Sequence, residues 1–238
     1  MKLRSIAYDF KLLRGDPMLM ISMMVPFILW ALMHFLFPVL EHVLMGRWNV
    51  DISPYYNQAG IFFLMLIPMM IGMVYGFILL DERDAGIITS IAVTPTGKSG
   101  YLKIRMGIPM AISFIFVILY LNLLQLNGVL NNIQLILISI LISSQSLVLL
   151  LVLGAFAHNK VMGMAITKGF GILLIGPLLD YGLPDPLDWL GAYSPLFWAS
   201  RSLLAASPTS FWLYAGITFL FGLVLIWILF RKFTARSD

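Results

Sequence analysis

Six long apolar stretches, separated by short polar segments, dominate the sequence. A helix needs about 20 apolar residues to cross roughly 30 Å of hydrocarbon. The fifth stretch is the least regular, because Lys168 interrupts it and Gly176-Pro177 is expected to kink it. The pattern predicts an all-α integral membrane protein with six transmembrane helices, which cover about 18–40, 58–80, 104–124, 133–157, 162–179 and 211–230.

The first 16 residues have the pattern of an amphipathic helix. At about 100° per residue, its apolar side chains fall within an arc of about 80°, and a helix of this kind lies in the cytoplasmic interface of a membrane. Asp16-Pro17 then suits an N-cap and the first helical residue of the first span. A basic N-terminus without regular structure is the alternative. The apolar positions are Leu3, Ile6, Phe10 and Leu13.

The composition agrees with a membrane location. The chain is 61% hydrophobic and 11% charged, whereas soluble domains are about 45–50% apolar and about 25% charged. The first apolar run is too long for a signal-peptide core and lacks a following small-residue cleavage site, so we expect it to be retained. The absence of cysteine excludes disulfides, thiolate metal sites and cysteine nucleophiles. No polar segment is long enough to bury a core of its own, so residues 1–238 are expected to form a single transmembrane domain.

The basic residues lie mostly on one side of the predicted spans. Of the 15 Lys and Arg residues, only Arg47 and Arg201 fall on the other side. The positive-inside rule therefore places both termini in the cytoplasm. We interpret the net charge of +4 as topology and contact with anionic lipid, not as a nucleic-acid surface.

The segment AVTPTGKS, residues 92–99, fits a loose nucleotide-binding P-loop pattern, and FILLDE, residues 77–82, looks like the strand that accompanies such a loop. A P-loop needs a strand and a helix to hold a glycine-rich loop around phosphates. Here the apolar run before Asp81 ends a membrane helix, and Pro95 would sit inside the loop. The sequence therefore argues against ATP binding by this chain.

The same loop has a different regular pattern. A charge cluster, Asp81 to Asp84, lies at the end of the second span. After it, Ile87, Ile88 and Ile91 are expected to share one face of a short helix, which the segment 94–97 would terminate. An apolar face exposed on a cytoplasmic loop suggests a docking surface.

Two segments carry a family resemblance. DERDAGIITSIAVTPTGKSGYLKIR, residues 81–105, resembles the Glu-Arg-acidic-x-Gly … Thr-Pro … Tyr-x-x-basic signature of type-2 ATP-binding-cassette (ABC) permeases, in which it forms a coupling helix between the second and third spans. Residues 159–204 are similar to that family's fifth span followed by re-entrant helices. The usual Gly-Thr-Leu-Glu run is replaced by Gly86-Ile87-Ile88-Thr89, which removes an acidic residue.

The resemblance implies a small exporter permease of the drug or peptide export type, with residues 1–16 as an elbow helix. ATP and Mg would belong to a separate ATPase subunit, with no cofactor or metal in this chain, and two permeases, identical or different, would combine with two ATPases. The expected location is the cytoplasmic membrane of a prokaryote. Residues expected to couple to the ATPase are Glu82, Arg83, Gly86, Ile87, Ile88, Ile91, Thr94, Pro95 and Tyr101.

Glu82 and Arg83 have other interpretations. They could pair within the permease, or be ordinary solvated residues at a helix end.

Residues 180–204 combine prolines with aromatic side chains at the density of a membrane interface, in helical pieces too short to span. They favour re-entrant or interfacial helices, whose marker residues are Pro184, Trp189, Pro195, Phe197 and Trp198.

Polar side chains inside the spans are candidates for a substrate path, because polar groups in hydrocarbon are costly. They are His34, Asn122, Ser143 and Gln145. Hydrogen bonding between helices is the alternative. Lys168 is expected to extend its amine toward the cytoplasmic face. The three histidines are scattered over different depths and suggest no metal site.

The leading hypothesis is the membrane subunit of an ATP-driven exporter of an amphipathic or lipophilic substrate such as a drug, peptide or lipid. An ion-coupled secondary carrier is a second hypothesis. It usually needs a carboxylate in the middle of a span, which is missing here, although His34 could titrate. A third hypothesis is a membrane scaffold or regulator that transports nothing.

Overall fold

The computed structural model describes residues 17–92, 97–125 and 130–235. These ranges contain six helices that are long and apolar enough to cross a membrane, so the predicted all-helical fold with six candidate spans is confirmed. The amphipathic helix predicted for residues 1–16 lies outside the described residues. The spans cover Met23–Trp48, Ser53–Asp84, Ser99–Leu123, Asn132–Phe156, Lys160–Gly182 and Pro208–Ala235.

Three of the spans are divided into shorter helices. The first consists of α2 (Pro17–Ala31) and α3 (Phe37–Trp48), the fourth of α7 (Asn132–Ser143) and α8 (Gln145–Phe156), and the fifth of α9 (Lys160–Phe170) and α10 (Ile175–Gly182). The others are α4 (Tyr56–Asp84), α6 (Gly97–Leu123) and α12 (Pro208–Ala235). Two short helices lie between spans: α5 (Ile87–Ala92) and α11 (Pro195–Leu203).

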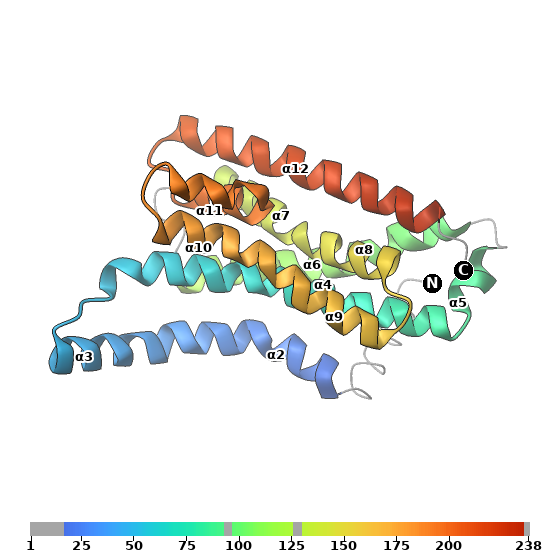
Figure 1. Cartoon of the computed structure of the whole chain (residues 1–238), viewed down its shortest axis with the longest axis horizontal. Coiled ribbons are helices and arrows are strands. Elements are labelled where there is room, and N and C mark those ends of the chain that lie inside the picture. The colour runs from blue at the N-terminus through green and yellow to red at the C-terminus, as the bar shows by residue number, and fades with distance from the viewer. Residues whose placement is uncertain (1–16, 93–96, 126–129, 236–238) are drawn as a thin grey trace.

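The helices form an antiparallel bundle with α4 at its centre (Figure 1). The first span runs along one side of α4, and α12 along the opposite side of the bundle. α5 lies at the end where α4 stops, and α11 lies beside α10 and α12 at the other end. Every residue from Ile71 to Leu80 is buried, so α4 forms the core around which the other spans pack.

Two glycines bring α4 into close contact with the fourth span. A Cβ on Gly72 would collide with the carbonyl of Ser146 and stand 2.9 Å from its Cα, and a Cβ on Gly76 would overlap the side chain of Leu153. Their spacing, Gly-x-x-x-Gly, places both on one helix face, which lets two backbones approach as membrane helices often do. Here the motif fixes the packing of α4 on α8 within one protomer.

Proline and serine explain where the spans break. Pro38 follows a π turn at Leu32–Leu36, which accommodates a residue without an N–H. The kink predicted at Gly176-Pro177 instead lies just upstream, in the 3-10 turn Gly171–Leu174, because Pro177 cannot donate to the carbonyl of Leu173. The fourth span, expected to be continuous over 133–157, breaks at Ser144. The hydroxyls of Ser144 and Ser146 each bond to the backbone carbonyl three residues earlier.

Candidate functional site

The end of α4 carries a buried ion pair. The Glu82 carboxylate accepts hydrogen bonds from Arg105 Nε at 3.0 Å and Nη2 at 2.8 Å, and from the Tyr101 hydroxyl. Glu82 is 7% exposed and Arg105 3%. A buried charge is tolerated only when it is paired and hydrogen-bonded. The three side chains therefore join the end of the second span to the start of the third.

Arg83 connects the same helix end to the fourth span. Its Nη1 donates to the carbonyl of Ala157 at 2.7 Å, and its Nη2 donates to the carbonyl of Gly154. The last carbonyls of a helix have no partner within the helix, and an arginine can satisfy them. Next to it, Asp81 pairs with Lys160 of α9 at 3.0 Å. The charge cluster 81–83 thus ties four spans together.

These contacts bear on the interpretations of Glu82 and Arg83. Pairing within the permease is the arrangement that the structure contains, so the functional groups of both side chains are already occupied inside the protomer. Tyr101 belongs to the same network. A contact of these three residues with an ATPase stays a prediction. The sequence did not identify Arg105 as the partner of Glu82, because a pairing between two helices leaves no local periodicity.

The short helix α5 occupies the position predicted for a coupling helix, but its surface differs. Ile88 is 1% exposed and belongs to the hydrophobic core, so the expectation of an exposed isoleucine face is wrong at this residue. Ile87 and Ile91 are half-buried, and Ser90 is exposed. The cause is the turn at Gly86, whose φ of 69° lets the chain fold back on the end of α4.

Thr94 and Pro95, predicted to shape this loop, lie outside the described residues.

The segment between the fifth and sixth spans is held against the break in the fifth span. The Ser194 hydroxyl donates to the Leu173 carbonyl at 2.7 Å, and the Tyr193 hydroxyl donates to the carbonyl of Ile172. Ser194 also caps α11, because its Oγ accepts from the Leu196 N–H at 3.2 Å. The Leu173 carbonyl, which Pro177 leaves without a helical donor, is thereby satisfied.

Ser194→Ala removes both functions of this hydroxyl. We expect the free energy of unfolding to fall by about 1–3 kcal/mol, because a cap is lost and a carbonyl is left unsatisfied. Thermal unfolding in detergent would measure this, with Thr234→Ala as the control, since the Thr234 hydroxyl bonds only to carbonyls of its own helix. Equal melting temperatures of the two variants would contradict the assigned roles of the Ser194 hydroxyl.

Arg201 organises the rest of this outer segment. Its Nε donates to Asp180 at 2.8 Å, its Nη2 pairs with Asp188, and its guanidinium lies 4.7 Å from the Trp189 ring centroid and 4.5 Å from that of Phe197. The two carboxylates neutralise the cation and the two rings cover it. The sequence singled out the aromatic residues here but not the arginine at their centre.

The marker residues of the predicted re-entrant segment divide into two groups. Pro195, at the start of α11, and Phe197 are buried, and Trp198 is half-buried and donates from Nε1 to the Ala192 carbonyl at 3.0 Å. Pro184 and Trp189 are exposed. α11 itself packs among α10, α12 and α7. A re-entrant position in the membrane stays a prediction.

The polar residues of the spans lie in different surroundings. Ser143 is buried and donates to the carbonyl of Ser139 at 2.6 Å, and Asn122 is exposed and donates to the Ile118 carbonyl at 2.7 Å. Gln145 is 2% exposed, and its Nε2 has no partner among the described residues. His34 lies exposed at the π turn, stacked on Trp30 at 5.3 Å between centroids. A substrate path lined by these four residues stays a prediction.

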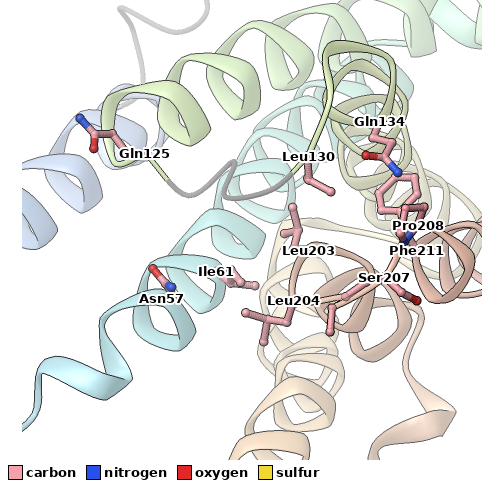
Figure 2. Close-up of a pocket in the computed structure, with 12 residues that line it drawn as sticks. Asn57, Ile61, Gln125, Leu130, Gln134, Leu203, Leu204, Ser207, Pro208 and Phe211 are labelled. Atoms are coloured by element: carbon pink, nitrogen blue, oxygen red, sulfur yellow. The ribbon is translucent and has the colours of Figure 1, made fainter.

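A cavity of about 260 Å³ opens at the end of the bundle opposite α5. Figure 2 shows that its walls come from the start of α4, the end of α6, the start of α7 and the connection between α11 and α12. Gln134 contributes its side chain on one side and Ile61 on the other. The mixed lining suits an amphipathic molecule.

The comparisons with known proteins agree with this architecture. The profile of a family described as "Fluoroquinolones export permease protein Rv2686c-like" matches residues 9–230. The chain belongs to this family of membrane export permeases. Two relatives, fluoroquinolones export permease proteins MT2760 and Rv2686c, come from the CDC 1551 / Oshkosh and H37Rv strains of Mycobacterium tuberculosis. Each is 28% identical over 227 residues, which cover 93% of this chain and 89% of the relative. No solved structure matches.

The family membership makes the chain a multi-pass membrane permease.

Proposed function

We propose that this permease is the membrane subunit of an ATP-driven exporter of the type-2 ABC class, which moves amphipathic drugs outward across the cytoplasmic membrane. The names of the family and of both relatives support drug export, and fluoroquinolones are the first substrates to test. The loop signature of residues 81–105 supports the ABC class. A separate ATPase, which binds ATP and Mg, docks on that loop, and a second permease copy completes the membrane part.

The observation that carries this proposal is the connection between α5 and the spans. α5 follows α4 directly, and α4 is joined to α6 through Glu82 and Arg105 and to the end of α8 through Arg83. A force applied to α5 therefore reaches several spans together. Closure of the ATPases on ATP is the signal, and the bundle switches between inward- and outward-facing arrangements as a two-state element.

The docking step predicts the effect of a charge on the exposed face of α5. Ser90→Arg is expected to reduce co-purification of the ATPase at least about tenfold, because an unpaired charge buried in an interface is costly. Ser90 is exposed, and its hydroxyl bonds only to the Gly86 carbonyl of its own turn at 2.9 Å, so the permease should fold normally. A pull-down from membranes in mild detergent, with quantitative mass spectrometry, measures the ratio of ATPase to permease.

Gly46→Arg is the matched control. Gly46 is exposed on α3 near the opposite end of the bundle, and a side chain there would meet nothing within 4 Å. The ratio of co-purified ATPase to Gly46→Arg permease should equal the ratio measured for the unmodified protein. If Ser90→Arg retained the ATPase as well as Gly46→Arg does, α5 would not be the docking element.

The energy source is tested separately in inverted membrane vesicles that contain the permease and its ATPase. Fluoroquinolone uptake should require ATP and continue after ionophores collapse the ion gradients. Uptake that followed an ion gradient without ATP would favour the secondary carrier instead.

A further inference from the structure

A groove of about 540 Å³ runs along the outside of the bundle between α6, the junction of α7 and α8, and α12. Its walls are almost entirely apolar and include Phe219, Trp227 and Phe230. The floor is deep at Gly222, which has no side chain, and the Ser144 hydroxyl beneath is satisfied by the Leu141 carbonyl at 2.6 Å. Gln145 Nε2, which lacks a partner among the described residues, lies 3.7 Å from the position that a Cβ on Gly222 would take.

One end of the groove carries positive charge. Lys103 lines it just before the apolar part of α6. Arg231, just after the apolar part of α12, does not line the groove itself but lies 4.7 Å over the ring of Trp227, which does. No carboxylate pairs with either cation among the residues that the structure describes. Both are on the side of the bundle that the charge pattern assigns to the cytoplasm. A tryptophan beside basic residues at this depth is typical of the membrane interface.

The length of the groove corresponds to one leaflet. Phe219 and Phe230 mark its ends on α12, and at about 1.5 Å per residue they are about 16 Å apart along the helix axis. This is about half of the roughly 30 Å of hydrocarbon in a bilayer. An acyl chain that enters from the cytoplasmic leaflet would therefore extend from the two cations to the bilayer centre.

We propose that this groove binds an anionic phospholipid of the cytoplasmic leaflet, with its phosphate at Lys103 and Arg231 and one acyl chain over Gly222. The charge at the interface end and the dry apolar walls are complementary to such a lipid, and basic sites between membrane helices on the cytoplasmic side bind lipid head groups. The bilayer supplies this ligand continuously. The apolar part of the site, on α7, at its junction with α8, and on α12, lies outside residues 81–105, on which the ATPase is proposed to dock, whereas Lys103 lies within them.

Native mass spectrometry of the full-length protein tests the site. The protein is titrated with phosphatidylglycerol and with phosphatidylcholine of identical acyl chains. Lys103→Gln should weaken phosphatidylglycerol binding about fivefold and leave phosphatidylcholine binding unchanged, and Lys103→Arg should retain the preference. Lys168→Gln is the matched control, because Lys168 is also an exposed lysine, on α9.

Gly222→Leu fills the groove and should weaken binding of both lipids. It is expected to fold, because an added Cβ meets only the Gln145 Nε2 and Ser144 Oγ, both at 3.7 Å. Unchanged phosphatidylglycerol binding in Lys103→Gln and Gly222→Leu would overturn the proposal. So would displacement of the lipid by a fluoroquinolone at equal concentration, which would assign the groove to cargo. A shift from dimer to monomer in lipid-free Gly222→Leu would assign it to a second copy and equally overturn the proposal.

Discussion

Glu82→Ala is expected to lower the free energy of unfolding by about 3–5 kcal/mol. The substitution leaves the Arg105 guanidinium, which is 3% exposed, without its bidentate carboxylate, and an unpaired buried charge is among the most destabilising changes that a protein can undergo. It also removes the acceptor of the Tyr101 hydroxyl. Thermal unfolding in detergent, with the amount of protein that remains monodisperse, would measure the loss.

A double variant separates the cost of leaving Arg105 buried without a partner from the cost of losing the ion pair itself. Glu82→Leu with Arg105→Leu removes both charges and fills the space with apolar atoms, so it should be markedly more stable than Glu82→Ala. Because the double variant no longer holds the ends of α4 and α6 together by charge, we expect it to fold but to couple ATP hydrolysis to transport poorly. Normal transport by the double variant would mean that the ion pair serves stability alone.

Asp81→Asn is the control for a charge on the same helix turn. Asp81 pairs with Lys160 at 3.0 Å, but their side chains are 30% and 42% exposed. Exposed ion pairs contribute about 0–1 kcal/mol. The melting temperature of this variant should therefore be close to that of the unmodified protein. A loss as large as that of Glu82→Ala would contradict the distinction between buried and exposed pairs in this cluster.

The spans and their order were predictable because they depend on local properties of the chain. An apolar stretch long enough to cross a bilayer is visible one segment at a time, and so is the position of α5 between two such stretches. Contacts between spans are a different matter. The burial of Ile88 depends on the turn at Gly86 and on the neighbouring spans, so helical periodicity alone assigned it to the wrong environment.

The polar groups show the same division. The cluster of charges at 81–84 was visible in the sequence. The sequence did not show that Glu82 pairs with Arg105, or that Arg83 donates to carbonyls at the end of α8. Arg201 was noted only as a cation on the outer side, whereas the fold places it between two carboxylates and two aromatic rings. In a membrane protein each such group must find an internal partner, and the tertiary fold decides which one.

Gly72→Ala is the second substitution with a large expected effect, and it adds a single methyl group. The new Cβ would stand against the backbone carbonyl of Ser146 and 2.9 Å from its Cα. A backbone cannot rotate away as a side chain can, so α4 and α8 must separate along the most buried part of the bundle. Overpacking of this kind costs about 1–3 kcal/mol or more, and it exceeds the gain of about 0.5–1 kcal/mol that alanine gives a helix over glycine.

Two other glycines make the comparison decisive, because all three substitutions give the same gain in helix propensity. At Gly76 the added Cβ meets the flexible side chain of Leu153, and at Gly107 it meets nothing within 4 Å. Melting temperatures in detergent should therefore rank Gly107→Ala highest, Gly76→Ala next and Gly72→Ala lowest, with Gly107→Ala equal to or above the unmodified protein. If Gly72→Ala had the same melting temperature as Gly107→Ala, the close approach of α4 to Ser146 would not exist. The centre of the bundle would then be packed differently from the arrangement described.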